Sequence, residues 1–180
     1  MTTAKTYIEE KYPEYSYTEI TISYDRGLYI VNYGDRELWV DIKGDEIFID
    51  QFRTSIANDQ AEKYKITIEG KLLESISSYA INPILKVMVI YHDDQAYQAY
   101  VDGVELSSPV NITIIEDVQN LRTEDEYIEF TQECISVVRN LDIPIDKLSI
   151  KSPPYGISLT NDMLDVSPSE LAEIIERNVP

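Results

Sequence analysis

The fold is decided by Tyr17–Asp50, which has the sequence YTEITISYDRGLYIVNYGDRELWVDIKGDEIFID. Apolar side chains occupy every second position in parts of this stretch, and such alternation places them on one face of a strand. The positions concerned are Ile20, Ile22, Tyr24, Leu38, Val40 and Ile42. A meander with one apolar face is not stable alone in water. The pattern therefore predicts an antiparallel sheet whose apolar face is covered by a helix.

Two tight turns separate the three predicted strands. Asp25-Arg26-Gly27 and Gly34-Asp35 supply the residues that such turns favour, because glycine adopts positive φ without steric cost. The segment after the third strand, Ile47–Ile49, is either a fourth short strand or the start of a helix.

Helices are predicted on both sides of the meander. Thr3–Tyr12 is a short helix that ends before Pro13, because proline disfavours the helical conformation of the preceding residue. Asp50–Ile81 carries apolar residues mostly at four-residue steps, which predicts one long helix. Its middle, Tyr64–Gly70, alternates like a strand, so a helix, a strand and a second helix are the alternative. Asn82-Pro83 ends the segment in both interpretations.

The second half begins with a continuous apolar run, Ile84–Tyr91, which predicts a buried central strand. His92–Gln95 is predicted as a turn, and Ala96–Val101 as a returning strand. Val110–Ile115 is predicted as a third strand of this half.

Two helices near the C-terminus have clear start signals. Thr123–Asn140 begins with a capping box formed by Thr123 and Glu126, and its first turn is acidic. A final helix begins at Ser167, with Glu170 closing a second capping box.

Short strands are predicted at Leu148–Lys151 and Tyr155–Leu159. The predicted fold class is therefore α+β, with two small subdomains that each contain an antiparallel sheet covered by helices. We place the subdomains at residues 1–82 and 83–180, with an α-β-β-β-α order in the first.

The chain is strongly acidic, with a formal net charge of -18 over 180 residues. Like charges repel, so this composition argues against nucleic-acid binding and favours a basic protein or peptide as partner. Cation binding, or an acidic surface that serves only solubility, are the alternatives. No stretch approaches the ~18 apolar residues of a membrane span, so we expect no membrane insertion by the chain itself. The acidic segment 83–130 contains the candidate partner-binding patch Glu124, Asp125, Glu126 and Glu129.

Aromatic residues concentrate in the predicted meander. Tyr29, Tyr33 and Trp39 form a candidate aromatic face that would bind a peptide or a sugar. Tyrosine also favours strands for packing reasons alone, so a structural role is the alternative.

Reactive side chains are scarce. His92, the sole histidine, stands beside Asp93 and Asp94 in a predicted turn, where a metal or acid–base role is conceivable. Cys134, the sole cysteine, lies on the apolar face of a predicted helix and is expected to act as a small buried hydrophobe. We therefore predict no catalytic residues, no metal and no cofactor.

Three segments resemble a known family: Ala4–Pro13, Tyr29–Tyr33 and Leu38–Ile42. Their order of helix, strand, turn and strand resembles PepSY-like domains and the YfjL-like small lipoproteins of Gram-positive bacteria. The resemblance covers roughly the first third to half of the chain. It implies an extracytoplasmic protein, anchored to the membrane if a leader precedes this sequence, and it supplies no catalytic residues.

The expected function is a non-enzymatic protein-interaction or ligand-binding module outside the cytoplasm. The alternative is an acidic cytoplasmic inhibitor or immunity-type protein that covers a basic partner such as a nuclease toxin.

Overall fold

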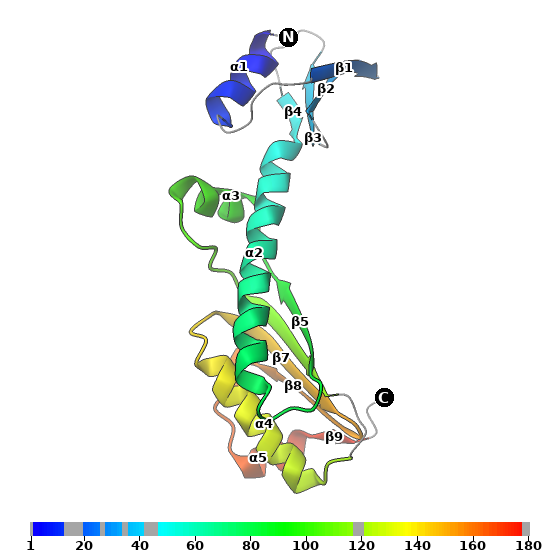
Figure 1. Cartoon of the computed structure of the whole chain (residues 1–180), viewed down its shortest axis with the longest axis vertical. Helices are drawn as coiled ribbons and strands as arrows, with labels where there is room; N and C mark the ends of the chain where they lie inside the picture. Colours follow the sequence, from blue (N-terminus) through cyan, green and yellow to red (C-terminus); the bar gives the residue numbers. More distant parts are fainter. Residues whose placement is uncertain are drawn as a thin grey trace.

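The computed structural model describes residues 2–12, 20–25, 28–33, 36–41, 47–116 and 121–177. Figure 1 shows an elongated molecule in which the first sheet lies at the start of one long helix, α2, and the second sheet lies alongside the C-terminal half of that helix. The α+β class and the division into two subdomains are confirmed.

The N-terminal subdomain consists of one helix and a four-stranded antiparallel sheet with the strand order β1-β2-β3-β4. Its elements are α1 (Thr2–Lys11), β1 (Ile20–Asp25), β2 (Leu28–Tyr33), β3 (Arg36–Asp41) and β4 (Ile47–Asp50). The predicted meander is thus confirmed, and the segment left open is a fourth strand. Leu38 and Val40 are buried on one face, as their alternation predicts, and Val31 of β2, opposite Leu38, is buried with them. The two predicted turns and Ile42 fall wholly or partly outside the described residues.

The long helix is confirmed as one continuous element, α2 (Gln51–Ile76), but its predicted end is wrong, because the helix stops at Ile76 and turns lead from Ser77 to Asn82. Its buried residues follow one helical face: Phe52, Ile56, Ala57, Ala61, Tyr64, Ile68, Leu72 and Ile76. Within the alternating segment, Tyr64 and Ile68 are buried while Ile66 is 58% exposed, as a helical period requires and a strand period does not.

The C-terminal subdomain contains a five-stranded sheet with the order β5-β6-β7-β8-β9. Its strands are β5 (Ile84–Val89), β6 (Val110–Ile115), β7 (Ile145–Ser152), β8 (Tyr155–Thr160) and β9 (Glu176–Arg177). The expectation of a purely antiparallel sheet is wrong here, because β6 and β7 are parallel. Helix α4 (Glu124–Arg139) connects them, and a helical crossover is the usual link between parallel strands.

Two further predictions in this half are wrong. Strand β5 is an edge strand with exposed residues, not a buried central one. The segment predicted as a turn and a returning strand is helix α3 (Asp93–Asp102), which ends at Gly103 with φ 65°. Ala96 and Ala99, three residues apart, are both buried, which is the spacing of one helix face and not of one strand face.

The two C-terminal helices are confirmed together with their start signals. α4 begins after the capping box of Thr123 and Glu126. α5 (Pro168–Ile174) follows the short 3-10 helix η1 (Asn161–Met163) and begins after the capping box of Ser167 and Glu170.

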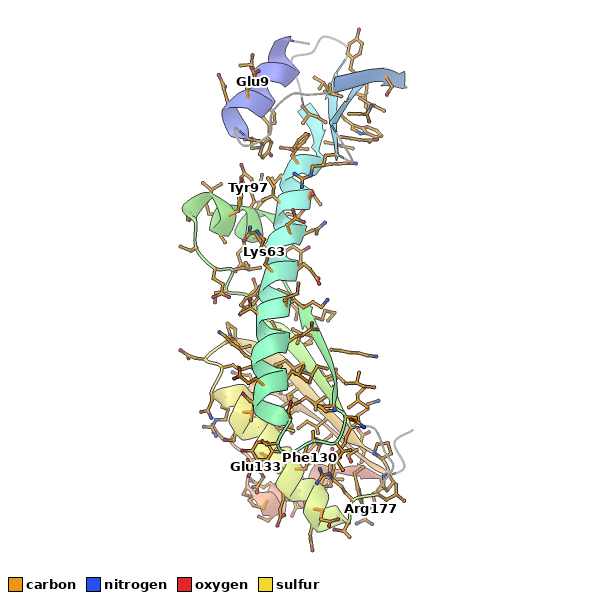
Figure 2. The ribbon with its side chains drawn as sticks, in the orientation of Figure 1. Glu9, Lys63, Tyr97, Phe130, Glu133 and Arg177 are labelled. Atoms are coloured by element: carbon orange, nitrogen blue, oxygen red, sulfur yellow. The ribbon has the colours of Figure 1, made fainter. Side chains whose placement is uncertain are left out.

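The described residues bury two hydrophobic clusters. The larger joins the sheet β5–β8 with α4 and most of α2, beginning at Ala57. The smaller joins the N-terminal subdomain with the start of α2, up to Ile56, and with Tyr97 and Tyr100 of α3. Tyr97 projects from α3 toward the N-terminal subdomain (Figure 2), and its ring lies 6.0 Å from that of Tyr12. The predicted boundary between residues 82 and 83 stays a prediction.

Candidate functional site

The outer face of α4 carries a row of three exposed carboxylates. Asp125, Glu129 and Glu133 follow one another at four-residue steps, so they share one side of the helix and extend over about 12 Å. No ion-pair partner lies next to any of the three within the described part of the chain. These charges are therefore available to a partner.

Two members of the predicted acidic patch are engaged within the protein. Glu124 forms an ion pair with Arg177 of β9. Glu126 accepts hydrogen bonds from the Thr123 amide at 2.7 Å and the Thr123 hydroxyl at 2.9 Å, and these bonds hold the pKa of Glu126 below its usual value. The structure thus leaves Asp125 and Glu129 open and adds Glu133, which the patch drawn from the sequence did not include.

A buried ion pair holds the start of α4 in place. Glu116 accepts hydrogen bonds from Arg122 Nε and Nη2, both at 2.7 Å, from the Ser152 hydroxyl at 2.7 Å and from the Ile81 amide at 2.9 Å. Burial alone would raise the pKa of Glu116, but these bonds, led by those from Arg122, lower it below the usual value. The Arg122 guanidinium also lies 4.4 Å from the ring centroid of Phe130.

A pocket of about 360 Å³ opens beside this ion pair. It is lined by Tyr79, Arg122, Glu126, Glu129, Phe130, Gln132 and Glu133. Two of the three open carboxylates on α4 therefore stand next to aromatic side chains. A basic side chain with an apolar stem finds both kinds of contact here.

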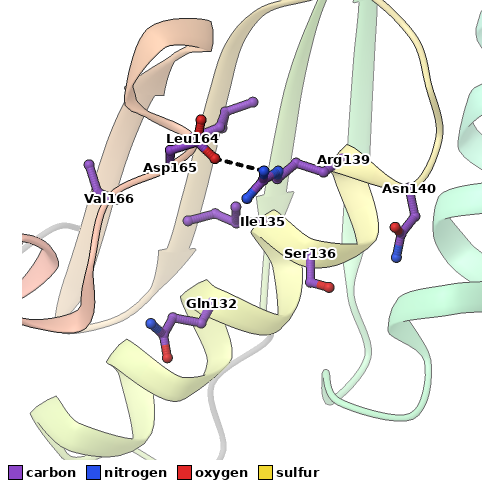
Figure 3. Close-up of a pocket in the computed structure, with 8 residues that line it drawn as sticks. All are labelled: Gln132, Ile135, Ser136, Arg139, Asn140, Leu164, Asp165 and Val166. Carbon is purple, nitrogen blue, oxygen red and sulfur yellow. Dashed lines mark ion pairs between the residues drawn. The ribbon is translucent and has the colours of Figure 1, made fainter.

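A second pocket, of about 500 Å³, lies between the end of α4 and the segment before α5. Arg139 and Asp165 point toward each other across it and form an ion pair at 2.7 Å (Figure 3). The other lining side chains include Gln132 and Ser136 of α4 and Asn140, which follows the end of that helix. These groups can form hydrogen bonds with a polar ligand, but Asp165, the sole lining carboxylate, is already paired.

The predicted aromatic residues do not all share one face. Tyr29 is opposite Val40, and Trp39 is opposite Ile30, so Tyr29 and Trp39 lie on opposite faces of the sheet. The Trp39 indole donates a 2.8 Å hydrogen bond to Glu37. Tyr33 is in β2, and its side chain lies outside the described residues.

Asp50 gathers a cluster of polar groups at the junction of β4 and α2. Its Oδ2 accepts hydrogen bonds from the hydroxyls of Tyr12 at 2.6 Å and Tyr7 at 2.8 Å, and from Lys11 Nζ at 3.0 Å. Its Oδ1 accepts the Arg53 amide at the start of α2. Each of these bonds ties α1 or α2 to the sheet, which indicates a structural role.

The residues considered for metal binding are consecutive in the chain, but both carboxylates among them contact residues of α2. His92 precedes α3, Asp93 accepts a hydrogen bond from Thr54 at 2.9 Å, and Asp94 pairs with Arg53 at 2.5 Å. Among the described residues, no group of three or more His, Cys, Asp or Glu is placed to hold a metal ion. Cys134 is buried, and burial raises the pKa of its thiol to about 12, so the thiol is protonated at neutral pH.

None of the helices in the described ranges combines the length and the hydrophobicity that crossing a membrane requires. Comparison with known proteins gives no further guide: no family model, no curated protein and no solved structure matches this chain. The resemblance to PepSY-like and YfjL-like proteins therefore stays a prediction.

Proposed function

We propose that this protein is a non-enzymatic interaction module that binds a basic protein or peptide through the outer face of α4. The observation that carries the proposal is the row Asp125, Glu129 and Glu133, which is exposed and has no internal ion-pair partner within the described residues. The net charge of -18 supports it, since a field of one sign attracts a partner of the other.

The expected interaction is fast and sensitive to salt. Each exposed ion pair contributes only about 0.2–1 kcal/mol to the binding free energy. At physiological ionic strength, salt also screens the attraction between exposed charges that are more than about 8 Å apart. The carboxylates would therefore provide orientation and association rate more than affinity. The adjoining pocket, with Tyr79 and Phe130 in its lining, would supply apolar contact for the stem of a lysine or arginine.

Two biological settings fit this chemistry. One is an extracytoplasmic module, possessing a membrane anchor if the native chain has a leader. The other is a cytoplasmic inhibitor or immunity-type protein that covers a basic active site. The native N-terminus separates them, because a signal sequence with a lipid-acceptor cysteine supports the first and its absence supports the second.

The test compares two triple variants that change the net charge equally. One is Asp125→Lys, Glu129→Lys, Glu133→Lys on α4. The control reverses three exposed acids elsewhere, Glu74→Lys, Glu105→Lys and Glu173→Lys. Binding of cytochrome c, a basic probe, is measured by titration calorimetry at low and at physiological salt.

We expect the α4 variant to bind at least about tenfold more weakly than the wild type, because three ion pairs become three repulsions. The control variant should lose much less. Equal losses in both variants would show that the probe responds to net charge alone. Absence of salt-sensitive binding by the wild type would contradict the proposal outright.

A further inference from the structure

Strand β5 is the first strand of its sheet, so one side of its backbone has no strand partner among the described residues. The Ile90 amide donates to the Pro109 carbonyl at 2.8 Å, which shows that backbone groups at even-numbered positions face β6. The backbone groups of Leu85, Val87 and Val89 therefore face outward. Figure 1 shows α2 running alongside this strand.

One outward amide is occupied by a side chain. Glu69 of α2 accepts a hydrogen bond from the Val87 amide at 3.3 Å. A carboxylate oxygen thus takes the position that the carbonyl of a neighbouring strand would occupy. The edge is accessible to an acceptor from outside the sheet.

A groove of about 470 Å³ lies between this edge and α2. It is lined by Asn58, Asp59, Ala61, Glu62 and Lys65 of α2, and by Val87, Met88, Val89 and Tyr91. The five residues from Val87 to Tyr91 extend over roughly 16 Å. The groove therefore matches a peptide of about five residues in an extended conformation.

Apolar side chains are exposed on both sides of the edge. Ile84, Met88 and Ile90 lie on the sheet face that the helices do not cover, and Met88 is 58% exposed. On the helix side, Ile66 and Leu73 are about half exposed. Exposed apolar residues gathered in this way are typical of a binding surface.

The helix wall of the groove is acidic. Asp59 pairs with Arg36 at 3.4 Å and Glu62 with Lys65 at 3.0 Å, but the two carboxylates remain 59% and 57% exposed. Pairs this exposed are weak and exchange readily for a ligand. Glu69 adds a third carboxylate at the strand edge.

We propose that an extended segment of a basic partner adds to β5 as a sixth strand in this groove. Side chains alternate between the two faces of a strand. Basic residues of the segment face Asp59, Glu62 and Glu69, and the apolar residues between them face Met88 and Ile90. This inference rests on the proposed function, because it assumes the same basic partner. A second copy of this chain is disfavoured as occupant, because each copy carries a net charge of -18.

The first test uses the blocked peptide Lys-Val-Lys-Ile-Lys-Val-Lys and a permuted peptide of the same composition with its lysines consecutive. We expect the alternating peptide to bind at least about tenfold more tightly. Two further peptides carry N-methyl groups on alternate residues, one on the lysines and one on the apolar residues. Only one side of a strand pairs with β5, so one methylated peptide should bind and the other should not. Binding by both, or by neither, would overturn strand addition.

The second test locates the peptide. The variant Asp59→Asn, Glu62→Gln, Glu69→Gln removes three charges and keeps a hydrogen-bond acceptor beside Val87. Its control is Glu74→Gln, Glu105→Gln, Glu173→Gln. The groove variant should bind the alternating peptide about tenfold more weakly, and the control about as well as the wild type. Equal affinity in both variants would overturn the inference.

The α4 charge-reversal variant separates this inference from the proposed function. The α4 variant should bind the alternating peptide within about twofold of the charge-reversal control Glu74→Lys, Glu105→Lys, Glu173→Lys, because both variants have the same net charge and leave the groove unchanged. Binding of cytochrome c that depends on α4, with no peptide binding in the groove, would leave the function standing and remove the inference. Sedimentation equilibrium is the last arm: a dimer that the alternating peptide dissociates would show that a second copy is the occupant, and would overturn the proposal.

Discussion

The Tyr12 hydroxyl donates a 2.6 Å hydrogen bond to Asp50, and this bond joins the residue that follows α1 to the residue that caps α2. Tyr12 is fully buried, and its ring stacks on Phe52 at 5.4 Å. Asp50 therefore adds hydrogen bonds to the apolar contacts that join the N-terminal subdomain to the long helix.

Replacing that carboxylate should destabilise the N-terminal subdomain. We expect Asp50→Asn to lower the free energy of unfolding by about 2–3 kcal/mol, because hydrogen bonds to a charged group are the stronger kind. Tyr7→Phe, which removes one of the same bonds, should cost about 1 kcal/mol. Urea unfolding followed by the fluorescence of Trp39, the sole tryptophan, measures both. Equal stability of Asp50→Asn and the wild type would contradict this role.

The buried pair of Glu116 and Arg122 should matter more. Glu116→Gln leaves the guanidinium without its counter-charge, at an expected cost of about 3–5 kcal/mol. The double variant Glu116→Gln, Arg122→Met should recover part of the loss, since neither charge is then left unpaired. Urea unfolding followed by circular dichroism measures the series. A double variant no more stable than Glu116→Gln alone would refute this coupling.

Acid should unfold the protein through the same two carboxylates. Burial alone would raise the pKa of each, but hydrogen bonds lower the pKa of Asp50 below its ordinary 3.8 and that of Glu116 below its ordinary 4.5. A lowered native pKa contributes stability above the unfolded value and loses it as pH falls through the native value. We therefore expect stability to be constant near neutral pH and to fall below about pH 4, with a shallower fall in Glu116→Gln. Identical pH profiles would contradict the assignment.

Two glycines should respond oppositely to alanine. Gly70 lies inside α2, and a Cβ there meets nothing within 4 Å, so Gly70→Ala should stabilise by about 0.5–1 kcal/mol. Gly103 ends α3 at φ +65°, so Gly103→Ala should destabilise by about 1–2 kcal/mol despite equal space. Thermal unfolding of the pair checks both signs. A gain at Gly103 would contradict the left-handed end of α3.

The Cys134 thiol should be inert in the native protein. Its burial and its raised pKa of about 12 leave almost no thiolate at neutral pH. Ellman's reagent should therefore react with less than about one per cent of the rate measured in urea. Rapid reaction of the folded protein would place the thiol at the surface.

The parts of the fold that sequence predicted are those where pattern and period agree. The meander follows from alternation, and α2 follows from a stripe at four-residue steps that outweighs the alternation of Tyr64–Gly70. Helix α3 was missed because Tyr97, Ala99 and Val101 also alternate, and the deciding feature is the burial of Ala96 and Ala99 on one helix face.

The sheet order and the open carboxylates could not be predicted in the same way. The parallel pairing of β6 and β7 depends on how α4 crosses the sheet, and the edge position of β5 follows from that arrangement. Glu124 is engaged by Arg177, which lies in another strand far along the chain. Only the folded structure shows that Asp125, Glu129 and Glu133 are the carboxylates of α4 that lack an ion-pair partner among the described residues.

Amide hydrogen exchange with and without cytochrome c at low salt tests the central claim most directly, because it locates the contact on the chain. The account predicts added protection on α4 over residues 125–133, and none in the Glu74 region of α2. Binding accompanied by protection elsewhere, with α4 unchanged, would contradict it.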